Sequence, residues 1–306
     1  LRLFVNPSKK NAVIQDLPYT VSLAQRVKKR GAFLLLDIHY SDTWADPGRQ
    51  SKPVEWERLS FQELEAEVES YTADVIATMK KANCLPDIVQ VGNEITPGFL
   101  WPEGRLQDEK GGWKNFSTLL KAGIRGVKKP LDVTDNLKIM IHIDKGGSAS
   151  KTSWFFSNLE KHQVEYDMIG LSFYPWRHGS IDDLRSNLKH TAEQFGKEIV
   201  IVETAYPWRK GKQTQNMGWP QTLQGQKQFL DDVIETVQST PRGLGSGVIW
   251  WYPESIPNKK LKVWMGGRMA LFDPEGHGLP ALEAFRTRRR ANNALHDDAA
   301  NRTRER

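Results

Sequence analysis

Two glutamates, Glu94 and Glu203, each lie where a short run of β-branched residues gives way to a turn. The runs read IVQVGNEI and EIVIVETAYPW. A buried strand that ends in an acid carries a carboxyl group to the edge of the sheet. Glycoside hydrolysis needs two carboxyl groups that flank one bond, so the pair predicts a polysaccharide-cleaving enzyme. For either glutamate alone, an acid that caps the following helix is an equal alternative.

Two further pairs of polar residues share one spacing. Asp37 and His39 lie two residues apart near the end of one apolar run, and His142 and Asp144 repeat that spacing at another. Side chains two apart on a strand face the same side, here the expected substrate cleft. The spacing would also suit a metal ion, but no cysteine, second histidine or acid cluster follows at ligand spacing. Polar lining of a binding site is therefore favoured over a metal site.

Strand-like and helix-like patterns alternate along the chain. The expected strands are Leu1–Val5, Phe33–His39, Ile88–Val91, Lys138–His142, Met168–Phe173, Ile199–Val202 and Gly247–Trp251. Apolar residues at steps of three and four predict helices over 21–27, 60–81, 113–127, 181–195 and 229–237. Ser60 and Glu63 form the signature of a capping box at the start of the longest helix.

Repeated strand–helix units predict an α/β fold with parallel strands and right-handed crossovers. A doubly wound sheet would show a glycine-rich turn after its first strand, but NPSKKN follows Leu1–Val5. A (β/α)8 barrel is therefore favoured. The chain provides seven strands and begins within one, so we expect the first barrel strand to be absent. We expect a catalytic domain over 1–285 and a basic, flexible or helical tail over 286–306.

Composition excludes several classes of protein. With 39% hydrophobic residues the chain can bury a core, and no apolar run reaches the roughly 18 residues of a membrane span. The tail from Arg286 holds seven arginines and three acids, so it carries +4 of the net +6. A basic end on a nearly neutral domain indicates a solvated tail rather than a nucleic-acid site. The single cysteine excludes an intrachain disulfide.

Several segments resemble known glycosidases. IVQVGNEITPGFLWPEGR is similar to the acid/base segment of clan A glycoside hydrolases, and VIVETAYPW is similar to their nucleophile segment. LLLDIHYSDTWADPGRQ, KIMIHID, DMIGLSFYPW and MALFDPEGHGLPAL resemble the endo-β-1,4-galactanases of glycoside hydrolase family 53. The similarity runs from Arg2 to about Phe285. Members of that family begin one strand and helix earlier, so LRLFVNP matches their second strand.

The resemblance implies a reaction. Glu94 matches the acid/base and Glu203 the nucleophile of a retaining enzyme that cleaves β-1,4-galactosidic bonds in the galactan side chains of pectin. Such a pair needs carboxyl groups about 5–5.5 Å apart, one protonated and one ionised. By the same resemblance, Asn93 bonds the sugar 2-hydroxyl, Tyr174 bonds the nucleophile and Arg2 keeps it ionised. The full set of expected substrate-binding residues is Arg2, Asp37, His39, Asp42, Trp44, Asn93, His142, Asp144, Tyr174 and Trp251.

Some segments depart from the family pattern. Trp251-Tyr252-Pro253 stands where Trp-Glu-Pro is common, and the loop WRKGKQTQNMGWPQ after the second glutamate has no carboxylate. Bacterial members can bind calcium in that loop, but calcium needs anionic oxygen ligands, so we expect none here.

Two alternatives stay open: a clan A β-glycanase acting on another β-galactan or a β-mannan, and an inactive carbohydrate-binding fragment. We expect no cofactor, no nucleic-acid partner and no membrane contact. A monomer that is secreted or periplasmic is expected.

Overall fold

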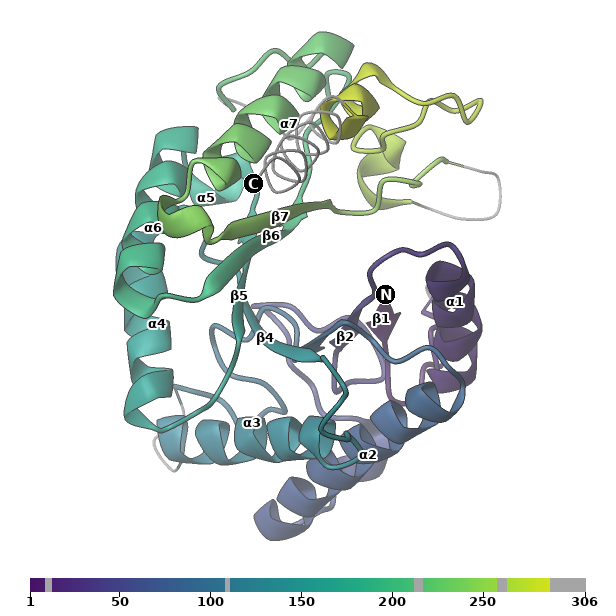
Figure 1. Ribbon diagram of the computed structural model, residues 1–306, viewed down its shortest axis with the longest axis vertical. Helices are drawn as coiled ribbons and strands as arrows, with labels where there is room; N and C mark the ends of the chain where they lie inside the picture. Colours follow the sequence, from purple (N-terminus) through teal and green to yellow (C-terminus); the bar gives the residue numbers. More distant parts are fainter. Residues whose placement is uncertain (9–12, 108–110, 212–216, 258–262, 287–306) are drawn as a thin grey trace, which may run out of the picture.

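Seven parallel strands form one curled sheet. The computed structural model describes residues 1–8, 13–107, 111–211, 217–257 and 263–286, and the strands follow one another in chain order (Figure 1). Their bounds are β1 Arg2–Leu3, β2 Leu35–Ile38, β3 Ile88–Val91, β4 Lys138–Ile143, β5 Met168–Phe173, β6 Glu198–Thr204 and β7 Gly245–Trp250. Every paired neighbour is parallel, which confirms the expected α/β barrel with seven strands. Within the described ranges, β1 and β7 each pair on one side only.

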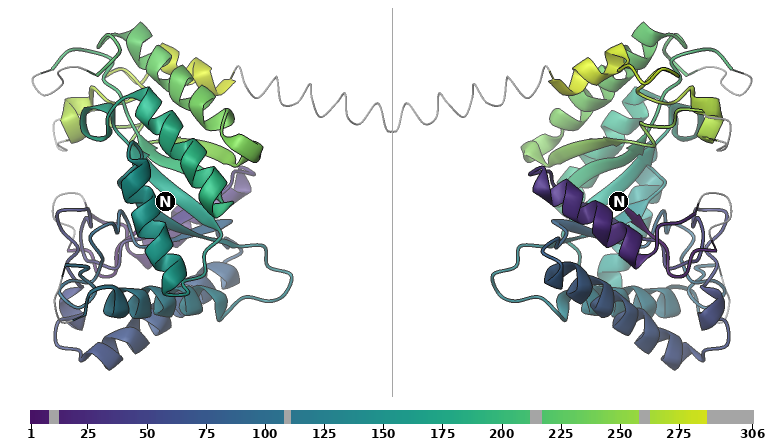
Figure 2. Two further views of the ribbon diagram at one scale, coloured as in Figure 1. Left: turned by 90° about the vertical axis from the view of Figure 1, so that its left-hand side faces the viewer. Right: turned by 90° about the vertical axis from the view of Figure 1, so that its right-hand side faces the viewer.

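The helices form a layer outside the sheet. They are α1 Leu17–Lys29, α2 Phe61–Lys81, α3 Gly112–Lys128, α4 Ala149–Lys161, α5 Pro175–His178, α6 Ile181–Phe195 and α7 Leu223–Gln238. Figure 2 shows α4 and α6 side by side on one flank and α1 on the opposite flank. The sequence patterns predicted five of these helices and missed α4 and the short α5. None of the described helices is long and apolar enough to cross a membrane.

The longest helix, α2, begins where its sequence predicts. Ser60 accepts a hydrogen bond from the Glu63 backbone N–H, and the Glu63 carboxylate accepts one from the Ser60 backbone, which completes the capping box. Leu64, Val68 and Val75 are fully buried against the core. The cap and the apolar stripe therefore fix both the start of α2 and the face that it turns to the sheet.

Two apolar layers follow from strand alternation. The larger lies between the strands and the helices, and Ile139, Ile141 and Ile143 of β4 belong to it. A smaller cluster fills the inside of the curled sheet and consists of Met140, Met168, Val200 and Val202. Side chains two apart on a strand share a face, so the inward row on β4 continues from Met140 to His142.

An irregularity in β6 turns Glu203 towards the inside of the sheet. Leu171 pairs with Ile201, but the next residue, Ser172, pairs with Glu203, so one residue of β6 is skipped at Val202. Regular alternation would place Glu203 with Ile201 in the outer layer. Because of the extra residue, Val202 and Glu203 both face inwards, and Glu203 comes opposite Ser172. Glu203 thus lies within β6, whereas the sequence placed it just beyond the strand.

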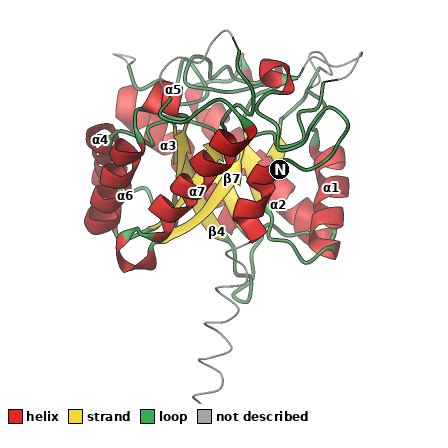
Figure 3. Cartoon of the chain, turned by 90° about the horizontal axis from the view of Figure 1, so that it is seen from above, coloured by secondary structure: helices red, strands yellow, loops and turns green. Residues whose placement is uncertain are grey.

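The loops that follow the strands gather at one end of the barrel (Figure 3). Glu94 follows β3 and Asp144 follows β4 at this end, while Glu203 lies near the end of β6. Parallel strands bring their carboxyl ends to one edge, which is where barrel enzymes hold their active sites. Of the expected tail over 286–306, all but residue 286 lies outside the described residues.

Candidate active site

The two glutamates meet at the carboxyl ends of the strands. Glu94 lies three residues after β3 and is 9% exposed, and Glu203 is 6% exposed. One carboxylate oxygen of each lies within 4.8 Å of the other and of a ring nitrogen of His142. Glu94 has a φ of 47°, in the left-handed region that costs a non-glycine residue about 1 kcal/mol or more. The surrounding contacts hold it in this strained conformation.

Glu203 has a cation and a hydroxyl as partners. Arg2 Nη2 donates to Oε1, and the Tyr174 hydroxyl donates to Oε2 at 2.8 Å. Burial and the negative charge of Glu203 raise the pKa of Tyr174 well above its usual value, so the hydroxyl keeps its proton as a donor. Both oxygens of Glu203 therefore receive hydrogen bonds that favour the ionised carboxylate.

Arg2 is itself held from three sides. Its Nε lies 3.3 Å from Asp37 Oδ2, and its Cζ lies 3.8 Å from the centre of the Trp251 ring. The guanidinium thus joins Glu203 to a second carboxylate and stacks on an aromatic face. These contacts fix the position of the charge that stabilises ionised Glu203.

Glu94 has the opposite surroundings. Burial raises the pKa of Glu94 well above its usual value, and the neighbouring charge of Glu203 raises it further. Among the described residues, its side-chain hydrogen-bond partner is Ser172, whose Oγ lies 2.5 Å from Oε1. Two carboxyl groups this close cannot both ionise easily, so the protonated member is the one without a cation.

The hydrogen bonds that link Ser172, His142 and Asn93 determine which ring nitrogen of His142 carries a proton. His142 Nε2 is 2.8 Å from Ser172 Oγ, and His142 Nδ1 is 3.2 Å from Asn93 Oδ1. The Asn93 amide is oriented by two contacts, since its Nδ2 donates to Ala45 O at 2.8 Å and its Oδ1 accepts from Gln90 Nε2 at 3.3 Å. Asn93 Oδ1 can only accept, so His142 Nδ1 must carry a proton.

Two protonation states satisfy every member of this network. With Glu94 protonated, Glu94 donates to Ser172, Ser172 donates to neutral His142, and His142 donates to Asn93. With Glu94 ionised, Ser172 donates to Glu94, and His142 needs a second proton on Nε2. Burial lowers the pKa of His142, which opposes that second proton. The network therefore favours protonated Glu94 beside a neutral imidazole.

Asp37 anchors the other side of the site. Its Oδ1 accepts from Gln90 Nε2 at 2.6 Å, and its Oδ2 lies 3.2 Å from His39 Nε2. Burial alone would raise the pKa of Asp37, but the His39 ring and the Arg2 guanidinium outweigh it and lower the pKa to about 2. The Ala45 backbone donates to His39 Nδ1, so the proton of a neutral ring sits on Nε2, facing Asp37.

The remaining expected site residues lie further from the carboxyl pair. Asp42 accepts from the backbone of Asn6 and Val54 at 3.0 and 2.9 Å, which ties two loops together. Asp144 accepts from Thr96 Oγ1 at 2.5 Å and from Lys145 Nζ at 2.7 Å. The Trp44 ring packs edge-on to Trp251, with centroids 5.8 Å apart. Their contact with a substrate stays a prediction.

Sequence reasoning missed Ser172 and two tryptophans. Ser172 precedes Tyr174 by two residues, so reading back along the strand from Tyr174 would have placed it on the same face. The rings of Trp176 and Trp264 lie 5.1 and 5.9 Å from that of Tyr174. Trp264 begins a short 3-10 helix far along the chain, and no local pattern indicated that it would reach the site.

A metal ion has one candidate position among the described residues, the group of Glu94, His142 and Glu203. A cation there would lie beside the Arg2 guanidinium on Glu203. It would also need the His142 nitrogen that already contacts Ser172 or Asn93. Charge repulsion and these hydrogen bonds make the donor set a poor fit for a metal ion.

Comparison with known proteins identifies relatives over nearly the whole chain. The sequence profile of "Glycosyl hydrolase family 53" matches residues 1–285. An uncharacterized protein of Niallia circulans is 44% identical over 89% of this chain and 78% of its own length. An arabinogalactan endo-β-1,4-galactanase of Thermothelomyces thermophilus is 33% identical over 93% of this chain and 85% of its own length.

Solved structures agree with the sequence relatives. The GH53 catalytic domain of Ignisphaera aggregans is 34% identical, covers 94% of this chain and 83% of its own, and superimposes with a TM-score of 0.84. An endo-1,4-β-xylanase of Penicillium canescens covers 92% of this chain and 81% of its own at 13% identity, with a TM-score of 0.62. At that identity the likeness shows the fold alone.

The contacts of Asp37 with Arg2 and His39 predict a pH-dependent contribution to stability. Because its folded pKa lies below the unfolded value of 3.8, the stabilisation is present above about pH 4 and is lost as the pH falls towards 2. We expect this contribution to the free energy of unfolding to be about 2 kcal/mol. Urea unfolding of wild type and Asp37→Asn should give a difference in unfolding free energy that is constant above pH 5 and shrinks below pH 4. A difference that stays constant down to pH 3 would contradict the lowered pKa.

Proposed function

The chain belongs to glycosyl hydrolase family 53, and we propose that it is an endo-acting enzyme that hydrolyses β-1,4-galactosidic bonds with retention of anomeric configuration. The observation that carries the mechanism is the pair of carboxyl groups. One oxygen of each lies within 4.8 Å of the other, which favours the close pair of a retaining enzyme over the wider pair of an inverting one. The relatives named as galactanases support the substrate.

In the first step, Glu203 is the nucleophile and Glu94 the acid. A Glu203 carboxylate oxygen attacks the anomeric carbon and forms a covalent galactosyl ester. The bond between that carbon and the glycosidic oxygen breaks, and the proton of Glu94 moves to the departing oxygen. Arg2 and Tyr174 hold Glu203 ionised before attack.

In the second step, Glu94 is the base. It takes a proton from water, whose oxygen attacks the anomeric carbon, and the ester bond to Glu203 breaks. Glu94 thereby regains the proton it lost, and the Ser172–His142 network returns to its favoured state. We propose that the free N–H of the Asn93 amide bonds the sugar 2-hydroxyl, because its other N–H is held by Ala45.

We propose galactan and arabinogalactan side chains of pectin as the substrate, residues 1–285 as the catalytic domain, and secretion or a periplasmic location. The location is proposed because an enzyme that cleaves a plant polysaccharide meets its substrate outside the cytoplasm. Trp251-Tyr252-Pro253 departs from the common family pattern beside the site, so a β-mannan or another β-galactan is the second candidate. Parallel assays on galactan and mannan separate the two.

Glu203→Gln should reduce galactan hydrolysis by at least about a thousandfold, since an amide cannot act as the nucleophile. Release of reducing sugar from β-1,4-galactan measures this. Glu198→Gln is the matched control, because Glu198 lies at the other end of β6, where it is partly exposed and pairs with Lys138. If Glu203→Gln keeps more than a few per cent of the wild-type rate while folded, another residue is the nucleophile.

Glu94→Ala should slow hydrolysis of galactan far more than hydrolysis of an aryl galactoside whose leaving group needs no proton. In wild type, the raised pKa of Glu94 keeps the acid protonated, so kcat/KM for galactan should fall as the pH rises through that pKa. In Glu94→Ala, kcat/KM for the aryl substrate should no longer fall at alkaline pH. Equal losses on both substrates would argue against the acid role.

A further inference from the structure

Arg268 is a buried guanidinium with no carboxylate partner. The residue is 7% exposed, its Nη1 has no hydrogen-bond partner, and its Nη2 has a sulfur contact, Met265 Sδ at 3.9 Å. Among the described residues it forms no ion pair. Burying a charge without a partner is costly, so a site of this kind favours an anion that is supplied from outside.

The neighbours of Arg268 add positive charge. The Gly211 backbone packs so closely that a Cβ there would lie 1.5 Å from Arg268 Nη1. Arg209 and Lys210, the residues before Gly211, are exposed, and Arg209 Nη2 donates to Gly266 O at 3.3 Å. Neither forms an ion pair within the described part of the chain. In sequence, the segment 208–221 contains no carboxylate.

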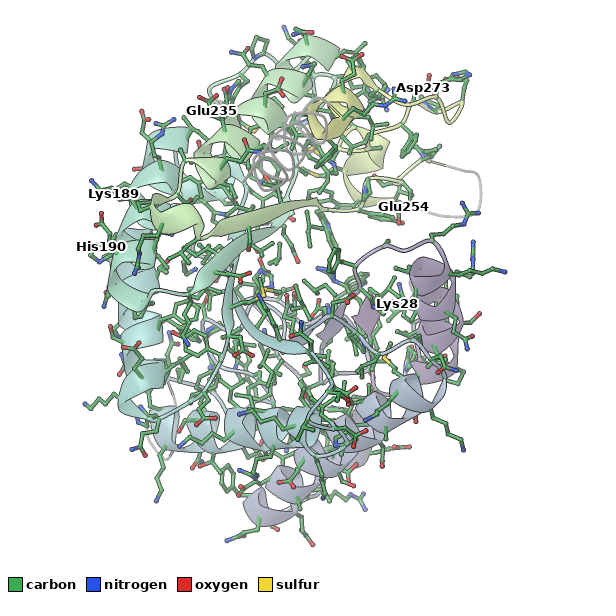
Figure 4. The ribbon with its side chains drawn as sticks, in the orientation of Figure 1. Lys28, Lys189, His190, Glu235, Glu254 and Asp273 are labelled. Atoms are coloured by element: carbon green, nitrogen blue, oxygen red, sulfur yellow. The ribbon has the colours of Figure 1, made fainter. Side chains whose placement is uncertain are left out.

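The acids that precede and follow Arg268 in the chain do not neutralise it. Figure 4 labels two of them, Glu254 and Asp273, on the loops after β7. Asp273 accepts from the backbone of Glu275 and His277 and from the His277 ring. Glu254 forms no ion pair with any described cation. Within the described ranges, the guanidinium thus has no counter-ion.

This cationic group, Arg209, Lys210 and Arg268, belongs to the same rim as the carboxyl pair. Trp264 begins the short helix η4 Trp264–Gly267, which Arg268 follows directly, and its ring contacts that of Tyr174, the donor to Glu203. Arg209 is six residues after Glu203, so the two are at most about 20 Å apart. Of the three cations, Lys210 lines a cavity of about 490 Å³, together with Gly211 and Trp219 among others.

We propose that Arg209, Lys210 and Arg268 bind a sugar carboxylate, so that the enzyme recognises galactan chains linked to uronic acid residues. This rests on the proposed galactanase function. Guanidinium groups bind carboxylates through charge-assisted hydrogen bonds. Nη1 is covered by Gly211, so Arg268 Nη2, which contacts the Met265 sulfur, would donate to the sugar carboxylate. Arg209 and Lys210, being exposed, would attract the acidic chain to the rim.

The test compares a neutral β-1,4-galactan with a pectic galactan that retains its galacturonate backbone. Wild type should show a higher kcat/KM on the acidic polymer at low ionic strength, and high ionic strength should reduce the preference. Arg268→Gln should lower the ratio of acidic to neutral kcat/KM about tenfold, through KM. Arg209→Gln and Lys210→Gln, at exposed positions, serve the same purpose if Arg268→Gln does not fold. Arg185→Gln on α6, paired with Asp182, is the control.

A binding measurement separates this proposal from the proposed function. Calorimetry with galacturonate oligomers should show binding to wild type that weakens about tenfold in Arg268→Gln, even if neither polymer is cleaved. Inorganic sulfate binding as tightly as the oligomers would overturn the sugar carboxylate and leave a general anion site. Equal kcat/KM on the two polymers together with no oligomer binding would overturn the proposal.

Discussion

Two carboxyl groups held a few ångströms apart, both out of water, are the constraint on which the structure of this site depends. Two negative charges at that distance repel each other, which favours one protonated and one ionised group. Which of the two keeps the proton depends on the surroundings of each. Glu203 receives hydrogen bonds from Arg2 and Tyr174, whereas Glu94 has Ser172 and no cation. The orientation of the Asn93 amide strengthens this asymmetry. Asn93 Oδ1 accepts from His142 Nδ1, so Nε2 of a neutral ring must accept from Ser172, which leaves Ser172 to accept from protonated Glu94.

The fold supplies this asymmetry through small departures from regular geometry. One skipped residue at Val202 turns Glu203 from the outer layer to the inside of the sheet, opposite Ser172. The left-handed backbone of Glu94 aims its side chain at the same point. The first departure interrupts the hydrogen bonding between β5 and β6, and the second strains the backbone of Glu94. Both lie at the carboxyl pair, as expected where function competes with stability.

The apolar runs predicted all seven strands, and the capping box of Ser60 and Glu63 predicted the start of α2, because burial and capping are local in sequence. The partners of Arg2 and Tyr174 could be anticipated from the family resemblance. The turn of Glu203 could not, since alternation along VIVET gives no sign of an irregular pairing. Nor could the buried, unpaired state of Arg268: the sequence located the excess charge in the tail and interpreted the basic loop only as a reason to expect no calcium. Both depend on contacts between distant segments.

The stereochemistry of the first product tests most directly whether the close carboxyl pair acts by double displacement. Proton NMR of galactan hydrolysis, followed before mutarotation, resolves the two anomers of the newly formed reducing end. Retention predicts that the β-anomer appears first and then equilibrates with the α-anomer. Initial formation of the α-anomer would mean single displacement by water and would contradict the assignment of Glu203 as nucleophile.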